Sequence, residues 1–367
     1  MKKILLLVGS LDIGGTEKQL VAKVLALKDK FDFEVFTIMH KGKLSKILEN
    51  SGIKIHEPFF KNKSNVINKV IFYISLLIQI FLKVLFSKSK VVHFYLPHAY
   101  ILGGVATSIF FWKKLVMSRR SMNYYQNNIS FARKIEYILH KRVNLIIANS
   151  KAIEKQLISE ENVPKEKIKL IYNGIKTKKK FTKKKKTKLE FICIANFFYY
   201  KNHSFLIDAC SFLPKNLNWS LKLVGKDSEN IVKELKNEVQ KKSLQNKIFF
   251  FPQSENIEKY LQDADIGFLF SKQEGLSNSI IEYMNNSLPV IASDIEGNRE
   301  LISNNRNGFL IKSNDTKDFV KKVLMLSQNE SKRIEMGTMG NKYIEKKFNY
   351  NMWKAHYYKL YNELLDD

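Results

Sequence analysis

Short apolar runs alternate with segments whose apolar residues recur at helical spacing along almost the whole chain. The runs have the length and residue types of buried strands, and the segments between them have the pattern of helices that cover a sheet. Because strands joined by helices lie parallel in one sheet, the alternation predicts an α/β protein whose sheets are covered on both faces. The expected strands include residues 4–8, 33–39, 91–94, 115–117, 145–148 and 168–171, then 191–194, 221–224, 248–251, 266–270 and 289–292.

A lysine-rich run at residues 176–188 interrupts this alternation. It holds nine lysines and one large apolar residue, Phe181. Such a run repels itself and has nothing to bury, which predicts an exposed linker; a basic interaction patch is the alternative. Two doubly wound, Rossmann-like domains that face each other would form a cleft at the carboxyl ends of their strands, where such sheets bind ligands. We expect these domains at residues 1–173 and 190–347, a linker at 174–189, and a C-terminal helix at 348–367 that packs back toward the first domain.

Lysine dominates the charge of the chain. Lysine and arginine total 62 against 35 aspartate and glutamate, a formal net charge of +27, yet only seven of the 62 are arginine. Proteins that read nucleic-acid sequence rely on arginine, so no nucleic-acid partner is expected and an anionic membrane surface is favoured. Two cysteines exclude a disulfide framework and predict a cytoplasmic protein, which lipid attraction would place at the inner face of the cell membrane.

Two apolar segments resemble membrane-directed sequences. Residues 4–8 follow two lysines as in a signal peptide, but the run ends at Gly9 without a cleavage site, so a buried first strand is expected. Residues 70–86 form an apolar run of 17 residues interrupted by Gln79 and Lys83, whereas about 20 are needed to cross a bilayer. The favoured interpretation is a buried helix of the α/β layers; a helix lying on the bilayer and a true span stay open.

The segment EGLSNSIIE, residues 274–282, has the most informative chemistry. It lies between two expected strands and predicts a glycine loop followed by a helix. On one continuous helix its two carboxylates would be about 80° and about 12 Å apart, too far for an acid–base pair. With Glu274 in the loop and Glu282 in the first turns, both border one ligand, and the loop N–H groups face phosphate or sugar oxygens. Alternatively, Ser279 and Glu282 form a capping box and Glu282 serves only the helix.

Two further blocks accompany this loop: GNRE at residues 297–300 and GGTE at residues 14–17, after the first strand. Together they resemble glycosyltransferase family 4, the large retaining family of the GT-B fold, and blocks at residues 149–150, 171–174 and 224–225 and at Asp265 extend the resemblance. The resemblance implies transfer of a sugar from a nucleotide-sugar, with a UDP-sugar favoured, to a hydroxyl of a glycan or lipid-linked acceptor. The expected pathway is cell-surface polysaccharide or lipopolysaccharide synthesis, and neither a metal nor another cofactor is expected.

The resemblance also assigns roles to residues. It implies that Glu274 contacts the donor sugar, that Glu282 holds the nucleotide ribose, and that the intervening loop amides bind sugar and diphosphate. Lys201 corresponds to the family's diphosphate-binding lysine, where a positive charge offsets the negative charge that develops on the leaving group; a lysine on a solvated turn is the alternative. The other implied donor-binding residues are Gly14, Gly15, Gly275, Leu276, Ser277 and Asn278.

The chain departs from the family five residues before Lys201. The family usually has an arginine there, and this chain has Asn196. The phosphate site therefore has one cation fewer than usual. Lys226 and Lys272 are the candidates to replace it.

Two further groups follow expected strands. His93 ends a strand and His98 opens the next helix, in a region where family members carry a histidine near the sugar; a structural histidine is the alternative for each. Arg119, Arg120 and Asn123 resemble a block on the acceptor side of close relatives, where guanidinium contacts would hold an anionic acceptor. An ordinary surface pair of arginines is the alternative.

Two other patterns are not expected to be functional. Asp263 and Asp265 have the Asp-x-Asp form that binds metal in other glycosyltransferases, but Asp265 directly precedes a buried strand and matches a structural position of the family. Cys193 and Cys210 have no accompanying ligands and are expected to be small core residues. Two rival functions stay open: a nucleotide-sugar epimerase of the same fold, and a basic scaffold that binds membranes or nucleic acid without catalysis.

Overall fold

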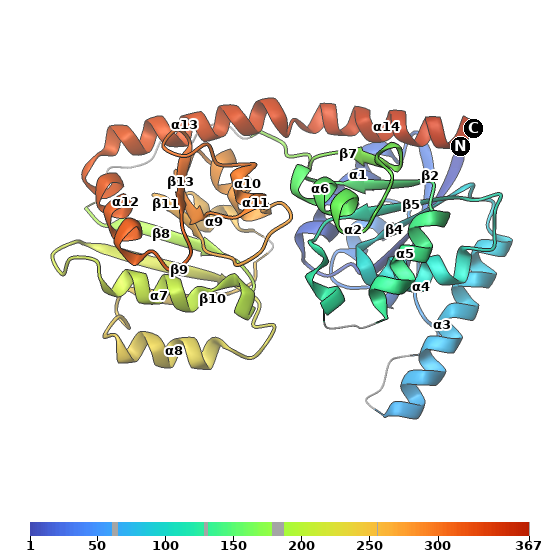
Figure 1. The fold of residues 1–367 in the computed structure, drawn as a ribbon, viewed down its shortest axis with the longest axis horizontal. Coiled ribbons are helices and arrows are strands. Elements are labelled where there is room, and N and C mark those ends of the chain that lie inside the picture. The colour runs from blue at the N-terminus through green and yellow to red at the C-terminus, as the bar shows by residue number, and fades with distance from the viewer. Residues whose placement is uncertain (61–64, 128–130, 178–186, 255, 367) are drawn as a thin grey trace. The chain divides into compact units, whose positions relative to one another are not determined.

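The computed structural model describes residues 1–60, 65–127, 131–177, 187–254 and 256–366. The chain divides into two compact units, one of Met1–Gly174 with Tyr350–Asp367 and one of Ile175–Asn349 (Figure 1). Residues 178–186, most of the expected linker, lie outside the described part.

A seven-stranded sheet forms the centre of the first unit, in the order β3-β2-β1-β4-β5-β6-β7. Every pairing in it is parallel. The parallel sheet predicted from the alternation is therefore confirmed for this half. The strands are β1 (Lys2–Ser10), β2 (Phe31–His40), β3 (Lys54–His56), β4 (Val91–Tyr95), β5 (Lys114–Arg119), β6 (Leu145–Ala148) and β7 (Ile168–Leu170).

Helices cover both faces of this sheet because successive residues of its strands face opposite sides. Leu6 of β1 belongs to a core with residues of α1 and α14, whereas Leu7 belongs to a second core with residues of α3, α4 and α5. The helices are α1 (Gly15–Leu27), α2 (Ser45–Glu49), α3 (Val66–Phe86), α4 (Leu96–Thr107), α5 (Ala132–Arg142), α6 (Lys151–Ser159) and α14 (Tyr350–Asp366), with 3₁₀ turns at Asn123–Asn127 and Lys165–Lys167.

The expected C-terminal helix is α14, and it is part of the first unit. Its aromatic residues Trp353, Tyr357 and Tyr361 are buried against that unit. At its far end Lys2 forms an ion pair with Asp366, which brings the two ends of the chain together (Figure 1). The aromatic composition of this segment is thus explained by burial.

The helix expected at residues 70–86 differs from its favoured interpretation. α3 is longer, with 21 residues, and it is buried along one side only, at Phe72, Leu76, Ile80 and Val84. The expectation of a buried helix is wrong, because most apolar side chains of α3 are exposed or only half-buried. Apolar residues occur on several sides of α3, so the sequence does not show which side packs. By length and composition, α3 is the one helix in the described part of the chain that is apolar enough to cross a membrane.

The second unit has a six-stranded parallel sheet in the order β10-β9-β8-β11-β12-β13. In both units the first strand lies between the second and the fourth, so each sheet reverses its strand order beside its first strand. The α/β architecture of two doubly wound domains is therefore confirmed. The strands are β8 (Leu189–Ile194), β9 (Trp219–Gly225), β10 (Ile248–Pro252), β11 (Ile266–Leu269), β12 (Val290–Ser293) and β13 (Gly308–Ile311). The helices are α7 (His203–Ser211), α8 (Val232–Lys241), α9 (Glu258–Leu261), α10 (Asn278–Asn285), α11 (Glu296–Arg299), α12 (Thr316–Gln328) and α13 (Glu330–Lys347), with a 3₁₀ turn at Tyr199–Lys201.

Candidate active site

Two of the sequence-predicted residues meet at the carboxyl edge of the second sheet. Lys201 follows β8 and Glu274 follows β11, and these two strands are neighbours at the point where the strand order reverses. Doubly wound sheets bind their ligands beyond the carboxyl ends of the strands at this point. The topology therefore places this pair where a ligand is expected.

Lys201 and Glu274 form a mostly buried ion pair. The Nζ–Oε1 distance is 2.5 Å, and the two side chains are 15% and 12% exposed. Burial by itself would lower the pKa of Lys201, but the Glu274 carboxylate outweighs burial and raises that pKa above its ordinary value of 10.5. Lys201 therefore keeps its positive charge at neutral pH, next to solvent on one side.

The loop that holds Glu274 is fixed from three directions. Ser271 donates its hydroxyl hydrogen bond to Glu274 Oε1 at 2.7 Å, and Ser293 at the end of β12 donates to the Ser271 carbonyl at 2.6 Å. Gly297 packs so closely that an added Cβ would lie 2.3 Å from the Glu274 carbonyl oxygen. Ser271 was not among the residues predicted from the sequence. Its place directly after the apolar run 266–270 could have indicated it.

Ser277 begins the helix that follows this loop. It is the N-cap of α10, and its Oγ accepts a hydrogen bond from the Ile280 N–H at 3.2 Å. The alternative prediction, a capping box between Ser279 and Glu282, is wrong. The N-cap of α10 is Ser277, two residues before Ser279, and Ser279 Oγ donates to the Ile194 carbonyl instead. Glu282 is the fifth residue of α10 and half-buried, so capping does not explain it.

α10 is also anchored to the end of β8. The Tyr283 hydroxyl accepts a hydrogen bond from the Ile194 N–H at 2.6 Å. The ring of Tyr283 crosses Gly267, where an added Cβ would lie 2.5 Å from it, so β11 needs a glycine there. Gly275 and Leu276 are buried and Asn278 is half-buried, which leaves the backbone N–H groups of the helix start as the groups suited to bind an anion.

Asn196 has a structural contact where the family has a cation. Its Oδ1 accepts a hydrogen bond from the Lys226 N–H at 3.1 Å, which ties the loop after β8 to the loop after β9. The side chains of Lys226 and Lys272 are both exposed. Lys272 donates its N–H to the Tyr200 carbonyl at 2.7 Å and so lies beside Lys201 in this loop cluster.

His203, which the sequence analysis did not single out, is buried two residues after Lys201. Its ring packs on Phe197 with centroids 4.8 Å apart. Burial, together with the Lys201 ammonium, lowers the pKa of His203 to about 4. The imidazole is therefore neutral at physiological pH.

In the first unit, Gly14 and Gly15 lie at the corresponding edge, after β1. Gly14 is the N-cap of α1 and Gly15 its first residue. An added Cβ on Gly14 would lie 2.1 Å from Glu17 Oε2, so this glycine makes room for a carboxylate. Burial raises the pKa of Glu17 above its ordinary value. The sequence analysis did not include Glu17 in the site, although it belongs to the same four-residue block.

The two histidines of the first unit differ in their environments. His93 is in the middle of β4, fully buried, and its ring nitrogens contact the Tyr361 and Ser118 hydroxyls at 2.8 Å each. Burial lowers the pKa of His93 far below its ordinary value. The ring of His93 is therefore enclosed and both its nitrogens have partners, which is a structural environment; its catalytic role stays a prediction. His98 is exposed in the first turn of α4 and stays a prediction.

Arg119 does not face a ligand site. It is fully buried, and its guanidinium donates to Glu136 at 2.9 Å and to Glu161. Burial alone would lower the pKa of Arg119, but the two carboxylates and Tyr125 hold it above its ordinary value. This is a structural environment, in which the two terminal nitrogens of Arg119 bind carboxylates, and its role at an acceptor stays a prediction.

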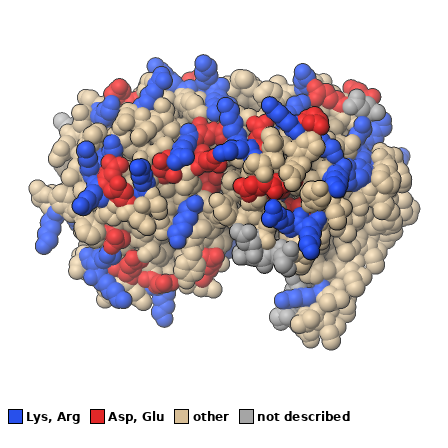
Figure 2. Space-filling model, viewed as in Figure 1, with Lys and Arg blue, Asp and Glu red and all other residues tan. Residues whose placement is uncertain are grey.

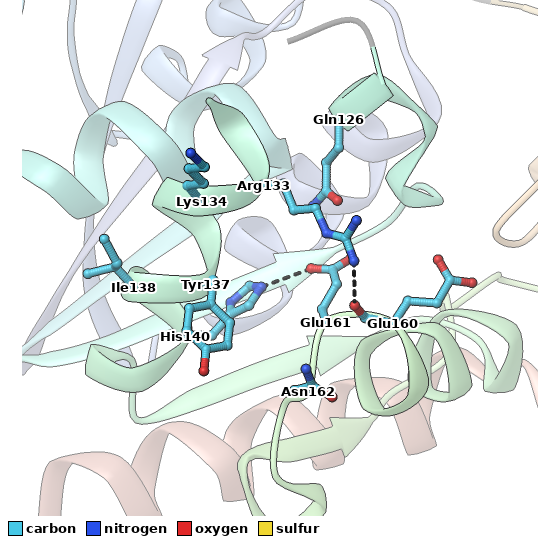
Figure 3. Close-up of a pocket in the computed structure, with 9 residues that line it drawn as sticks. All are labelled: Gln126, Arg133, Lys134, Tyr137, Ile138, His140, Glu160, Glu161 and Asn162. Atoms are coloured by element: carbon cyan, nitrogen blue, oxygen red, sulfur yellow. Dashed lines mark hydrogen bonds and ion pairs between the residues drawn. The ribbon is translucent and has the colours of Figure 1, made fainter. Parts of the chain in front are cut away.

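A pocket of about 360 Å³ opens on the outer side of this cluster, between α5 and the segment after α6. Figure 3 shows His140 pointing to Glu161, with His140 Nε2 2.9 Å from Glu161 Oε2. Arg133 reaches the Glu160 carbonyl across the same pocket. The polar groups that line its floor are thus already bonded to one another.

Arg120 and Asn123 also contact the protein. Arg120 is 9% exposed and donates to Asn173 Oδ1 at 2.6 Å. Asn123 is half-buried and donates its side-chain amide to Glu160 Oε2 at 2.9 Å. Their roles at an acceptor stay predictions.

The remaining candidates have structural environments. Asp265 Oδ2 accepts a hydrogen bond from the Glu190 N–H at 2.9 Å, which fixes the start of β8. In the part of the chain that the structure describes, no three His, Cys, Asp or Glu residues are grouped to hold a metal ion. Cys193 and Cys210 are buried core residues, as predicted, and burial raises the pKa of Cys193 to about 12.

Two doubly wound domains with a charged pair and a helix N-terminus at one sheet edge define the GT-B class of glycosyltransferase. The family model for Glycosyl transferases group 1 matches residues 174–343, and the model for Glycosyltransferase Family 4 matches residues 13–179. The two models together span almost the whole chain. The chain belongs to glycosyltransferase family 4.

Relatives and solved structures agree with this assignment. The capsular polysaccharide biosynthesis glycosyltransferase CapH from Staphylococcus aureus is 26% identical over 320 residues, 82% of this chain and 84% of its own. The UDP-Gal:alpha-D-GlcNAc-diphosphoundecaprenol alpha-1,3-galactosyltransferase of Escherichia coli is 25% identical over 170 residues, 46% of this chain and 44% of its own. HepE from Anabaena in complex with UDP-glucose has a TM-score of 0.82 and 19% identity, with 99% of this chain and 100% of that chain covered. This structural likeness supports the fold.

Proposed function

We propose that this protein is a hexosyltransferase that moves a sugar from a UDP-sugar to a hydroxyl of a glycan or lipid-linked acceptor, with retention at the anomeric carbon. The reaction belongs to cell-surface polysaccharide or lipopolysaccharide synthesis and takes place in the cytoplasm. The observation that supports it most is the Lys201–Glu274 pair beside the N-terminus of α10.

In this proposal the second unit binds the donor. The Lys201 ammonium and the first backbone N–H groups of α10 bind the diphosphate, and Glu282 accepts hydrogen bonds from the ribose hydroxyls. Glu274 accepts a hydrogen bond from the donor sugar and fixes Lys201 in place. The proposed roles of Gly14 and Gly15 in donor binding, and of His98 near the sugar, rest on the family resemblance alone.

Transfer then takes place on one face of the sugar. The bond from the anomeric carbon to the diphosphate oxygen breaks as the acceptor oxygen forms its bond to the same carbon, through an oxocarbenium-like state. The acceptor proton passes to the departing phosphate oxygen. Lys201 stabilises the negative charge that develops on the diphosphate, so rate arises from positioning and electrostatics. Glu274 is a donor contact in this scheme and forms no covalent bond.

The names of the relatives support the choice of substrates. CapH acts in capsular polysaccharide biosynthesis, and the Escherichia coli relative is named for a UDP-sugar donor and a diphosphoundecaprenol acceptor. HepE is in complex with UDP-glucose. A UDP-sugar donor and a lipid-linked or glycan acceptor are therefore the first substrates to test.

A donor screen tests the proposal. A UDP-sugar at about a hundred times its dissociation constant stabilises the folded protein by about 2.7 kcal/mol, which raises its melting temperature, whereas uridine has little effect. NMR of the product is expected to show the anomeric configuration of the donor, and activity is expected to persist with EDTA. The proposal fails if no nucleotide-sugar stabilises the protein or if the product is inverted.

Incubation with the donor alone separates the epimerase alternative. A transferase leaves the UDP-sugar unisomerised without an acceptor, whereas an epimerase converts it to its epimer. Mass balance and NMR of the nucleotide-sugar after incubation distinguish the two.

A further inference from the structure

The outer side of α3 is an apolar surface that nothing in the first unit covers. Figure 1 shows α3 projecting from that unit, and in Figure 2 the same projection is almost entirely uncharged. Ile74 and Ile78, near its middle, are 55% and 53% exposed. The exposed residues recur three or four positions apart, so they form one stripe along the helix. The stripe includes Ile67, Val70, Ile74, Ile78, Leu82 and Phe86.

The opposite side of α3 fastens it to the domain. Phe72, Leu76, Ile80 and Val84 recur every four residues and belong to the core that contains Leu5 and Leu7 of β1. A short connection also holds the end of the helix, since α3 ends at residue 86 and β4 begins at residue 91. The helix is thus held along the domain from Phe72 onward, while residues 66–71 project and are exposed on all sides. Its apolar stripe faces solvent over about 31 Å.

Aromatic residues extend this surface at one end. Phe86, the last residue of α3, is 78% exposed, and Phe59 is 85% exposed and donates its N–H to Gln79 of α3. A hollow of about 900 Å³ opens beside them, and Lys88 is among its lining residues. Exposed phenylalanine rings add to the apolar face of an interfacial helix, and neighbouring lysines suit an anionic headgroup layer.

Basic residues predominate around the stripe, although Glu34, which pairs with Lys83, and Glu57 line the hollow at its end. Residues 58–135, which include α3, hold twelve lysines and arginines and no aspartate or glutamate. Lys69 on α3 and Lys88 and Lys90 after it are exposed. Basic residues near an anionic lipid surface each strengthen attraction to it, and an apolar helix face adds burial among the acyl chains.

We propose that the outer face of α3 docks this protein on an anionic phospholipid bilayer, with the helix axis in the plane of the membrane. An upright span would remove Phe72, Leu76, Ile80 and Val84 from the core of the first unit. A second copy fits less well, because a twofold interface sets the same lysine-rich patch against itself.

The test measures binding of the full chain to vesicles. The probes are vesicles of phosphatidylglycerol mixed with phosphatidylcholine and vesicles of phosphatidylcholine alone, in a flotation assay at low and high salt. Binding is expected on the mixed vesicles, at least about tenfold weaker on the neutral ones, and weakened by salt.

The double substitution Ile74→Gln with Ile78→Gln is expected to lower the partition coefficient by about tenfold or more. Because neither side chain packs in the core, circular dichroism and the melting temperature should stay unchanged. The matched control is Ile334→Gln on α13, where the side chain is 62% exposed and far from this stripe in the sequence. This control should bind as the wild type does.

A second pair of variants tests the charge. Lys88→Gln with Lys90→Gln is expected to weaken binding about fivefold or more. Lys317→Gln with Lys321→Gln on α12 removes the same charge from exposed positions of the other unit and should have a smaller effect.

Four results would overturn the proposal: no binding to mixed vesicles, equal binding by the isoleucine variant and the wild type, release only by detergent, or a dimer that the isoleucine variant abolishes. The last two would indicate a span and a second copy of the chain. Vesicle binding is measured without substrate, so its failure leaves the proposed transfer reaction untouched.

Discussion

Arg119 ends β5 and Lys201 follows β8, each at the carboxyl edge of a parallel sheet, and each binds a carboxylate, but their surroundings differ. Arg119 is fully buried between Glu136 and Glu161. Lys201 has one carboxylate partner, Glu274, and both side chains keep some exposure. A fully buried cation between two carboxylates is out of reach of a ligand, whereas a partly exposed cation with one carboxylate partner keeps N–H donors for an anion.

A basic residue at the end of a strand can therefore bind an anionic ligand only if carboxylates of the protein do not already neutralise its charge. The histidine near each cation shows the same difference. His140 contacts Glu161 on one ring nitrogen and Tyr100 on the other, whereas His203 is buried beside the Lys201 ammonium. One cluster is fully buried, whereas in the other Lys201 keeps its charge and some exposure.

Removing Arg119 should have the largest effect, and the effect should be on stability. Arg119→Gln leaves Glu136 and Glu161 buried without their cation, so we expect a loss of about 3–5 kcal/mol in the free energy of unfolding. Urea denaturation measures it. Arg306→Gln, at an exposed position, should change stability by less than about 0.5 kcal/mol. A loss below about 1 kcal/mol for Arg119→Gln would mean that its network is not closed.

Removing Lys201 should act mainly on the reaction. Lys201→Ala is expected to lower kcat by about a hundredfold to a thousandfold, because the leaving diphosphate loses its cation. Steady-state kinetics with the donor found in the screen measure this, and circular dichroism checks the fold. Lys241→Ala, at an exposed position of α8, is the control. Unchanged kcat in Lys201→Ala would show that the open pair is not part of the chemistry.

The environment of His203 predicts a pH dependence of stability. Its pKa is about 4 in the folded protein against an ordinary 6.5, so the unfolded chain binds the extra proton first as the pH falls. The stabilisation is complete above about pH 6.5 and declines by about 3 kcal/mol as the pH approaches about 4. His203→Asn should lack this pH-dependent stabilisation. The measurement is the free energy of unfolding against pH for the wild type and for the variant, and the difference between the two curves gives the contribution of His203. Parallel profiles would contradict the buried neutral histidine.

Glu282 should affect donor binding more than the chemical step. Glu282→Gln keeps the size of the side chain but removes its charge, so the KM for the donor is expected to rise about tenfold with kcat nearly unchanged. Glu345→Gln on α13, at an exposed position, is the control. An equal fall in kcat would assign Glu282 to the transition state rather than to ribose binding.

Local sequence predicted the sheets well because strand and helix patterns are local. The strands it missed, β3 and β13, have three and four residues and little alternation to detect. The 274–282 loop was also predictable, since its glycine, serines and carboxylates lie within nine residues.

The burial of Arg119 and His93 was not predictable, because the residues that contact them lie far away in the sequence. Glu161 is 42 residues from Arg119, and Tyr361 is 268 residues from His93. No local pattern shows that these side chains meet. The exposed side of α3 escaped prediction for a related reason: its residues are apolar all round, and the fold alone decides which of them pack.

Titration calorimetry with UDP and with uridine tests the account most directly. If Lys201 binds the diphosphate, Lys201→Ala weakens UDP binding by about tenfold or more and changes uridine binding by less than about twofold, because uridine has no phosphate. Equal UDP affinities for the variant and the wild type would contradict a donor site at the Lys201–Glu274 pair.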